Sequence, residues 1–448
     1  MTATTNTQRI AERLNLSGDV PVMGISEFQN WYNHYDAPLP ELRLPVEEPE
    51  RAVTDCIDAH VAAGVNNLVW SCGRSVLSYH SEVAGTTRQT TETMAPILDK
   101  ICPLRIALQY GRRNGVSIMG RLCMNRHYGP EHPENCSRFV RENVGMLEKG
   151  RNGDLIKSRV CYALEAVQQE RIDILLEIQR LGVDALVLDY CRQMPVLNYH
   201  EALVEPYLQK TGVDPRQFHS TRPGDYADWF QYRADILTGF MRKYRQEQQR
   251  QEKEDGRNCP LIVRIPDSAP WLMIAYGLDI ERWCKEDLVD GIMLSPFPRT
   301  LEDTRLHPEY HIELARRYDK YAIGGIGSLN LMRSKGNGNT LENTGFFHAK
   351  PVYGKAHRQY AAGCDAMSLY QSETLARLKY LQSTIAELGD KTAVAEKAQH
   401  LPDPDPEVLL RQNSSAGSIG LDWHSAWCHP KIKRGETLST ELSGTSAL

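Results

Sequence analysis

Residues 183–192 read Val-Asp-Ala-Leu-Val-Leu-Asp-Tyr-Cys-Arg, an apolar run that ends abruptly in ionisable and aromatic side chains. Apart from Asp184, the run is apolar as far as Leu188 and has the length of a strand, which favours a parallel sheet covered on both faces. Asp189 closes this run. A carboxylate in that position is expected at the carboxyl edge of the sheet, where α/β folds bind their ligands.

Seven other stretches along the chain have the same character and alternate with amphipathic segments. The predicted strands are 21–26, 67–72, 116–122, 183–189, 260–265, 289–295, 321–325 and 364–370. Helical patterns lie between or after them at about 48–64, 95–114, 165–181, 225–249, 277–286, 307–318, 355–362 and 371–388. Eight strand-helix units predict an α/β fold of the (β/α)8 TIM barrel type, because a doubly wound sheet rarely needs so many units.

The rest of the chain is expected to surround this barrel. We predict a loose leader with a short helical piece at 1–20, a barrel domain at 21–390 and a partly irregular extension at 391–448. A long irregular insertion is predicted at about 123–158, after the third strand, and a loop of that length is more often functional than idle. The charged stretch 245–257 is expected to be solvated. The extension carries Trp423 and Trp427, which could cover the barrel or join two copies in a homo-oligomer; a partly disordered tail is the alternative.

Composition narrows the possible partners. The chain has 448 residues, 41% hydrophobic and 24% charged, with a net charge of −5 and no long basic block, so we expect no nucleic-acid or membrane partner. Its beginning lacks the apolar run of a secretory signal, and its eleven cysteines form no Cys-x-x-Cys pair. These features predict a cytoplasmic protein with reduced thiols. We also expect no cofactor and no bound metal.

Polar and aromatic side chains gather where the predicted strands end, and Arg74 and Arg121 belong to this group. Carboxylates mixed with aromatic rings and arginines are typical of a carbohydrate site, since sugars present apolar faces and hydroxyls together. The candidate substrate-binding residues are Glu27, Trp31, Trp70, Tyr79, His80, Arg126, His127, Tyr190, Arg192, Arg264 and Tyr370. Trp271 is a further possible sugar platform, although any one tryptophan could instead be a packing residue. His127 could equally be a hydrogen-bonded loop residue.

Glycosidic cleavage usually needs two carboxyl groups, one that donates a proton and one that attacks or activates water. Asp189 is the candidate for the second role, because Arg192 and Arg264 could hold it ionised. The candidate proton donors are Asp267, Glu373 and then Glu27. The alternative interpretation is that Asp189 only pairs with an arginine at the barrel rim.

Residues 169–192 resemble the block "helix, then Val-Asp-Gly-Ile-His-Leu-Asp-Tyr-Ile-Arg-Phe-Pro" of the glycoside hydrolase-like TIM-barrel proteins known as family 10 glycosylhydrolases. Residues 263–293 and 362–370 are similar to two further blocks, so the likeness covers about 24–388. The resemblance implies a TIM barrel that hydrolyses a glycosidic bond, with a catalytic role for Asp189. Cys191 and the pair Gln193-Met194 depart from the family's pattern.

The sequence therefore predicts a glycoside hydrolase that acts on an oligo- or polysaccharide with a carboxylate pair at the carboxyl-end face of the barrel. Arginines at several strand ends suggest an anionic sugar, sulfated or uronic. Two alternatives stay open. One is a carbohydrate-binding barrel without catalysis, and the other is a metal-dependent hydrolase that uses His80, His127 and Asp267.

Overall fold

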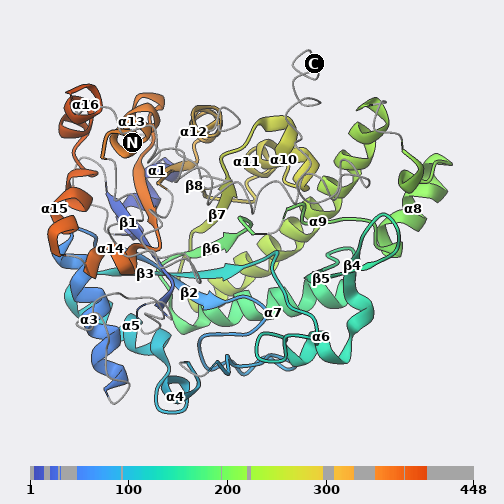
Figure 1. Cartoon of the computed structure of the whole chain (residues 1–448), viewed down its shortest axis with the longest axis horizontal. Helices are drawn as coiled ribbons and strands as arrows, with labels where there is room; N and C mark the ends of the chain where they lie inside the picture. The colour runs from blue at the N-terminus through green and yellow to red at the C-terminus, as the bar shows by residue number, and fades with distance from the viewer. Residues whose placement is uncertain are drawn as a thin grey trace, which may run out of the picture.

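The computed structural model contains a closed barrel of eight parallel strands surrounded by helices (Figure 1). The structure describes residues 5–14, 21–28, 31, 48–91, 94–192, 194–218, 223–295, 307–326, 349–377 and 379–400. The strands of the barrel are β1 Val22–Ser26, β2 Asn67–Gly73, β3 Ser117–Cys123, β6 Leu186–Asp189, β7 Leu261–Pro266, β8 Gly291–Ser295, β9 Tyr321–Ile326 and β10 Ala366–Tyr370. Their order around the barrel is β1-β10-β9-β8-β7-β6-β3-β2. The predicted (β/α)8 barrel is confirmed.

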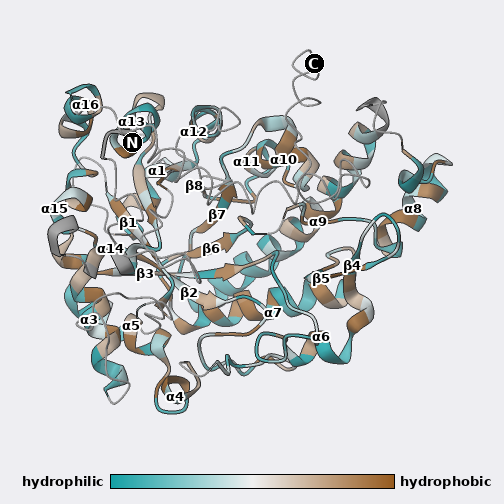
Figure 2. Cartoon of the chain, in the orientation of Figure 1, coloured by the Kyte–Doolittle hydropathy of each residue, from teal (hydrophilic) through white to brown (hydrophobic). Residues whose placement is uncertain are grey.

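Helices cover the outside of the barrel, and Figure 2 shows hydrophobic and hydrophilic stretches alternating along helices such as α7, as expected for amphipathic helices on a core. The principal helices are α3 Pro49–Ala62, α5 Pro103–Asn114, α7 Glu165–Leu181, α8 Glu201–Thr211, α9 Pro223–Asp255, α10 Pro270–Tyr276, α11 Ile280–Lys285, α12 Pro308–Arg317, α13 Ala349–Ala362, α14 Ser372–Arg377, α15 Lys379–Glu387 and α16 Lys391–His400. The continuous helix predicted at 95–114 is wrong. It is split into α4 Ala95–Leu98 and α5, because Pro103 disfavours a helical conformation at Cys102 and starts the next helix itself.

The insertion after β3 is more regular than predicted. It contains α6 Arg138–Glu142 and the short helix η2 Val144–Met146, followed by the antiparallel pair β4 Leu147–Lys149 and β5 Leu155–Val160. The backbone N–H of His127 donates to the carbonyl of Ser158 at 2.7 Å, which ties the start of the insertion to β5. The bond between His127 and Ser158 joins residues about thirty positions apart, so residue pattern alone does not reveal it.

The end of α9 is also less solvated than its charge predicted. Gln248 and Gln251 are buried, and their side-chain amides donate to the carbonyls of Cys259 at 2.8 Å and Leu176 at 3.0 Å. Arg245 forms an ion pair with Asp290 at 2.8 Å. This part of α9 is therefore attached to the barrel by polar contacts.

The barrel interior is filled by alternate residues of the strands. Met23, Val69, Met119, Val187 and Ile323 belong to one buried cluster inside the barrel, as expected when every second side chain of a strand points inward. Two residues further toward the carboxyl ends of β1, β3, β6 and β7, the inward positions hold charged side chains. These four strands therefore carry an apolar lower part and a charged upper layer.

The segment predicted as a loose leader closes the other end of the barrel. Helix α1 Asn6–Arg13 begins with a capping box at Thr5, and Ile10 and Leu14 pack into the interior cluster of the barrel. The Ser117 hydroxyl donates to the Leu14 carbonyl at 2.6 Å. The leader was predicted as loose because its few apolar residues gave no sign of the surface that they cover.

Other predictions are tested only in part. The ten cysteines in the described ranges are buried free thiols. None of the described helices has the length and apolar character needed to cross a bilayer. Residues 391–400 form α16, which packs against α13, whereas Trp423, Trp427 and the predicted homo-oligomer contact lie outside the described residues.

Replacing Leu14 by Ala tests the closure of the barrel by α1. Leu14 has no exposed surface, so the truncation should lower the free energy of unfolding by about 2–5 kcal/mol. Leu208→Ala on α8 is the matched control, because Leu208 is 37% exposed and should cost about 1 kcal/mol or less. Urea unfolding followed by circular dichroism measures both. Equal effects would show that α1 does not contribute to the barrel core.

Candidate functional site at the barrel mouth

Strand alternation carries the charged side chains to the barrel mouth. Asp189 follows Val187 on β6, Arg264 follows Ile262 on β7, and each lies two residues beyond an interior apolar residue. Asp189 and Arg264 are also partners in the register of β6 and β7. Arg121 on β3 lies two residues beyond Met119, and Glu27, just past the end of β1, lies two residues beyond Ile25. Side chains from four strands therefore meet at the carboxyl-end face.

Arg121 is the centre of this layer. Its guanidinium donates through Nη1 to Asp189 Oδ2 and through Nη2 to Glu27 Oε1. The exposed fractions of these side chains are 2% for Arg121, none for Asp189 and 5% for Glu27. One buried cation thus connects the carboxylates of β1 and β6 across β3.

Arg264 completes the contacts of Asp189 from the other side. Its Nη1 donates to Asp189 Oδ2 at 2.9 Å, and its Nη2 donates to the hydroxyl of Ser295 on β8. The Arg264 guanidinium lies 4.5 Å from the centre of the Tyr370 ring, a cation–π distance. The backbone N–H of Cys191 donates to the other oxygen, Asp189 Oδ1, at 2.9 Å.

These contacts fix the charge of Asp189. Burial raises the pKa of this carboxyl, but the charges of Arg264 and Arg121 outweigh burial and hold the pKa well below its usual range. Asp189 is therefore ionised at any ordinary working pH. Such a group can attack, activate water or hold a cation, but it cannot donate a proton.

Glu27 has the same electrostatic character. Burial raises the pKa of this group, while Arg121 and Arg74 lower it, and the net result is a pKa of about 2. The guanidinium of Arg74 lies 3.6 Å from Glu27 Oε1, and that of Arg192 lies 4.0 Å from it. Glu27 was the third candidate for the proton donor. This low pKa argues against Glu27 as the proton donor, because a proton donor must be protonated when substrate binds; the choice of donor stays a prediction.

The remaining carboxyl groups lie around this network. Glu373, at the start of α14, is fully buried, and its Oε2 accepts from the backbone N–H of Glu27 at 3.2 Å. Asp267, just after β7, is also buried and forms an ion pair with Lys355 of α13 at 2.9 Å. The structure thus brings Glu373 directly to Glu27, while Asp267 is engaged by a cation from a surrounding helix.

Several residues predicted to bind substrate belong to the core outside the barrel. Trp31 and Trp70 are 3% and 1% exposed, and Trp70 stacks on Phe28 with a centroid distance of 5.0 Å. Tyr190 is buried against Trp283, and its hydroxyl donates to the sulfur of Met241. The residue after an inward one on a strand points outward, so Trp70 on β2 and Tyr190 after β6 pack against the core between the strands and the helices. Substrate binding by these aromatic residues stays a prediction. Trp271, in contrast, is 63% exposed at the start of α10.

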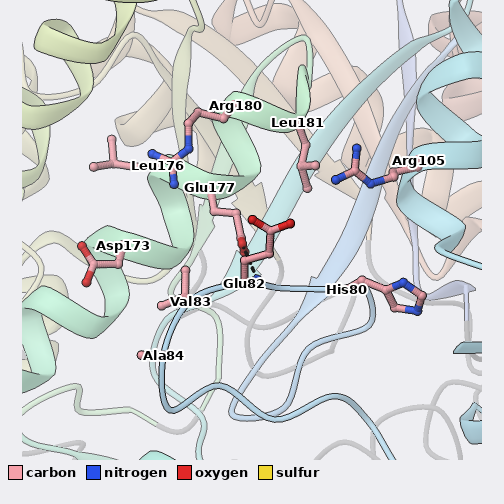
Figure 3. Close-up of a pocket in the computed structure, with 10 residues that line it drawn as sticks. All are labelled: His80, Glu82, Val83, Ala84, Arg105, Asp173, Leu176, Glu177, Arg180 and Leu181. Atoms are coloured by element: carbon pink, nitrogen blue, oxygen red, sulfur yellow. Dashed lines mark hydrogen bonds between the residues drawn. The ribbon is translucent and has the colours of Figure 1, made fainter.

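Tyr79 and His80 are likewise turned away from the mouth. The Tyr79 hydroxyl donates to Glu177 of α7 at 2.6 Å, and the backbone N–H of Glu82 donates to the other oxygen of Glu177. His80 Nε2 is 2.6 Å from the Leu98 carbonyl oxygen. Figure 3 shows His80, Glu82 and Glu177 around a lateral pocket of about 520 Å³ between α5, α7 and the chain after β2. The chain after β2 is thus hydrogen-bonded to α7 through Glu177.

The proposed metal set is not assembled among the described residues. His80 lines the lateral pocket, and Asp267 pairs with Lys355. His127 is buried, and burial together with the charge of Arg171 lowers the pKa of this imidazole. The described chain contains no group of three His, Cys, Asp or Glu side chains placed to hold a metal ion.

Two important residues were not recognised as partners from the sequence. Arg121 was noted at a strand end but not as the bridge between Glu27 and Asp189. A usable signal exists, since an arginine at an inward position of a fully buried strand must find an anion inside the barrel. Lys355 gave no comparable signal, because it lies on a helix face and its partner is distant in the sequence.

Comparison with known proteins agrees with this architecture. No family model matches the sequence, and no curated protein matches it. Among solved structures, the β-galactosidase of the psychrophilic Marinomonas ef1 matches with a TM-score of 0.51 and 12% identity, over 91% of this chain and 67% of that chain. The α-L-fucosidase isoenzyme 2 of Paenibacillus thiaminolyticus matches with a TM-score of 0.47 and 12% identity, over 84% of this chain and 49% of that chain. At this identity the likeness to the β-galactosidase shows the fold alone. The narrower resemblance to family 10 glycosylhydrolases stays a prediction.

The charge network predicts a specific loss of stability in acid. The pKa of Glu27 is about 2 in the folded protein and about 4.3 in an unfolded chain. The contribution of the Glu27 carboxylate to the free energy of unfolding is therefore fully present above about pH 5 and is lost as the pH falls toward 2. The Glu27→Gln variant should be less stable than the wild type at pH 7 by about 3–5 kcal/mol, because Arg121 loses one of its buried anions.

Urea unfolding between pH 7 and pH 2 measures this difference. The wild type should approach the stability of Glu27→Gln as the pH falls, and Glu313→Gln, an exposed change on α12, should follow the wild type throughout. A constant gap between wild type and Glu27→Gln over the whole range would contradict the low pKa of Glu27.

Proposed function

We propose that this protein is a glycoside hydrolase that acts on an oligo- or polysaccharide at the barrel mouth, as a relative of the family 10 glycosylhydrolases. The observation that carries the proposal is the buried network in which Arg121 joins two ionised carboxylates, Glu27 and Asp189, with Glu373 beside them. Catalytic groups of TIM-barrel enzymes lie at this face. The fold that the chain shares with the Marinomonas β-galactosidase supports the same class.

Asp189 is the proposed ionised partner of the reaction. Its low pKa suits a nucleophile or a group that activates water, and its hydrogen bonds hold it in one orientation. A carboxylate has about four lone-pair positions, and three are used by Arg121, Arg264 and Cys191. The fourth is the position proposed to act on the sugar or on water.

The proton donor is proposed to be Glu373, with Asp267 as the second candidate. The low pKa of Glu27 argues against this role for it, and Asp267 is paired with Lys355. Glu373 is buried next to Glu27. Guanidinium groups outnumber the carboxylates that they contact in this network, so the proposal includes a sugar that carries an anionic group.

Asp189→Asn is the direct test of the proposed reaction. On any glycan that the wild type cleaves, the variant should lower turnover by about 10²–10⁴-fold, because the charge that acts on the substrate is lost. Asp184→Asn is the matched control, since Asp184 belongs to the same run but faces the opposite end of the barrel, next to Arg13. Steady-state rates over a broad glycan panel give the measurement. Unchanged turnover in Asp189→Asn would remove Asp189 from the reaction.

Glu373→Gln tests the assignment of the proton donor. Turnover should fall similarly, and the alkaline limb of the pH-rate profile should disappear, because that limb reports loss of the donor's proton. Substrates with a leaving group that needs no protonation should be affected least. If Glu373→Gln keeps the alkaline limb and Asp267→Asn loses it, Asp267 is the donor instead.

A carbohydrate-binding barrel without catalysis is the second candidate. The observation that favours this function is that Asp189 has no exposed surface and is surrounded by arginines. Glycan binding by the wild type without turnover, and with Asp189→Asn reducing affinity, would support this function over hydrolysis.

A further inference from the structure

Arg74 has an unusually incomplete set of contacts for a guanidinium at the edge of a buried network. Its side chain is 25% exposed, and its ionic contact with Glu27 Oε1 is 3.6 Å long, which is too long for a hydrogen bond. That oxygen already accepts from Arg121. The Arg74 guanidinium donates no hydrogen bond to any residue that the structure describes.

Arg126 resembles Arg74 in this respect. It is half-buried after β3, and its guanidinium lies 5.1 Å from the centre of the Tyr128 ring. Its Nε is buried without a hydrogen-bond partner in the described part of the chain. Burial lowers the pKa of Arg74, but the charge of Glu27 outweighs burial, and the pKa of this guanidinium is raised overall.

Arg121 and Arg264 differ from this pair at their terminal nitrogens, although the Nε of each is likewise buried without a hydrogen-bond partner in the described part of the chain. Arg121 and Arg264 are each 2% exposed, and each donates to two oxygens of the network. The side chain of Asn125, which precedes Arg126, accepts from the backbone N–H of Arg192 at 3.2 Å. This bond holds the chain at Arg126 beside the mouth. Besides Arg192, which contacts Glu27 and the Tyr370 ring, the mouth thus contains a buried pair of arginines that neutralises the carboxylates and a partly exposed pair, Arg74 and Arg126, with unused donors.

We infer that Arg74 and Arg126 bind an anionic substituent of the sugar, a uronic acid carboxylate or a sulfate ester, beside the bond that is cleaved. A planar guanidinium presents paired N–H donors that match the oxygens of either group. A partly buried cation without hydrogen bonds is unfavourable until an anion supplies them. The inference rests on the proposed function, because it places a sugar at the mouth.

The test compares Arg74→Gln and Arg126→Gln with Arg105→Gln in the full chain. Arg105 is an exposed arginine of α5 at the lateral pocket (Figure 3), and it has no hydrogen bond or ion pair with the described residues. It is therefore a matched control that lies away from the mouth. Calorimetric titration measures binding of uronate-containing oligosaccharides, sulfated oligosaccharides and their neutral counterparts.

The wild type should bind one of the two anionic classes at least about tenfold more tightly than the neutral counterpart. Arg74→Gln and Arg126→Gln should each lower that affinity by about 10–100-fold, as expected for lost charge-assisted hydrogen bonds. Their affinity for the neutral counterpart should not change, and Arg105→Gln should behave as the wild type. The anionic class that binds more tightly shows whether the site takes a uronic acid carboxylate or a sulfate ester.

The outcomes separate this inference from the proposed hydrolysis. Turnover of neutral glycans with no preference for anionic ones would overturn the inference and leave the hydrolase intact. Anion-dependent binding through Arg74 and Arg126 without any turnover would support the inference and reject hydrolysis. Binding of neither class, or an equal loss in Arg105→Gln, would refute the inference outright.

Discussion

The buried contact of Arg121 with Glu27 and Asp189 is the interaction on which the mouth of this barrel depends. The three residues come from β3, β1 and β6, so a single guanidinium ties together strands that are not all neighbours. Burying such charges is costly, and only a complete set of partners offsets that cost. Arg264 and the N–H of Cys191 complete the set around Asp189. Loss of any one member would leave an uncompensated charge inside the barrel.

This network also decides what chemistry each carboxyl group can perform. Arginine contacts keep Glu27 and Asp189 ionised, so both are unsuited to proton donation however well they are placed. Acid and base roles in a glycosidase require two environments that push the pKa values of two carboxyl groups apart. One of these environments is formed by the arginines. For the proposed hydrolysis, the second environment is that of Glu373 or Asp267, the two remaining candidates for the proton donor.

Local pattern was sufficient to predict the strands and the approximate place of Asp189. Each barrel strand is an apolar run whose end is marked by polar residues, and these ends are a property of the sequence itself. The partners of Asp189 are predictable only in part. Arg264 follows from its place at a strand end, whereas the contact with Arg121 depends on the alternation of β3, which turns the Arg121 side chain into the barrel. Tyr79 and His80 were misplaced for a related reason. Once the chain leaves a strand, contacts such as Tyr79 with Glu177 decide its direction, and these join residues about a hundred positions apart.

The two ends of the barrel have opposite characters, and this separation has a functional consequence. At the lower end, Ile10 and Leu14 of α1 extend the apolar interior, so closure there is a matter of hydrophobic burial. At the upper end, the same strands carry charged side chains two residues further on. The free energy gained by hydrophobic burial scales with the apolar area buried. The apolar lower part can therefore stabilise the barrel even where the charged mouth adds little to the free energy of unfolding or lowers it. The mouth can then retain partly exposed cations such as Arg74, whose donors are available to a ligand because the fold does not use them.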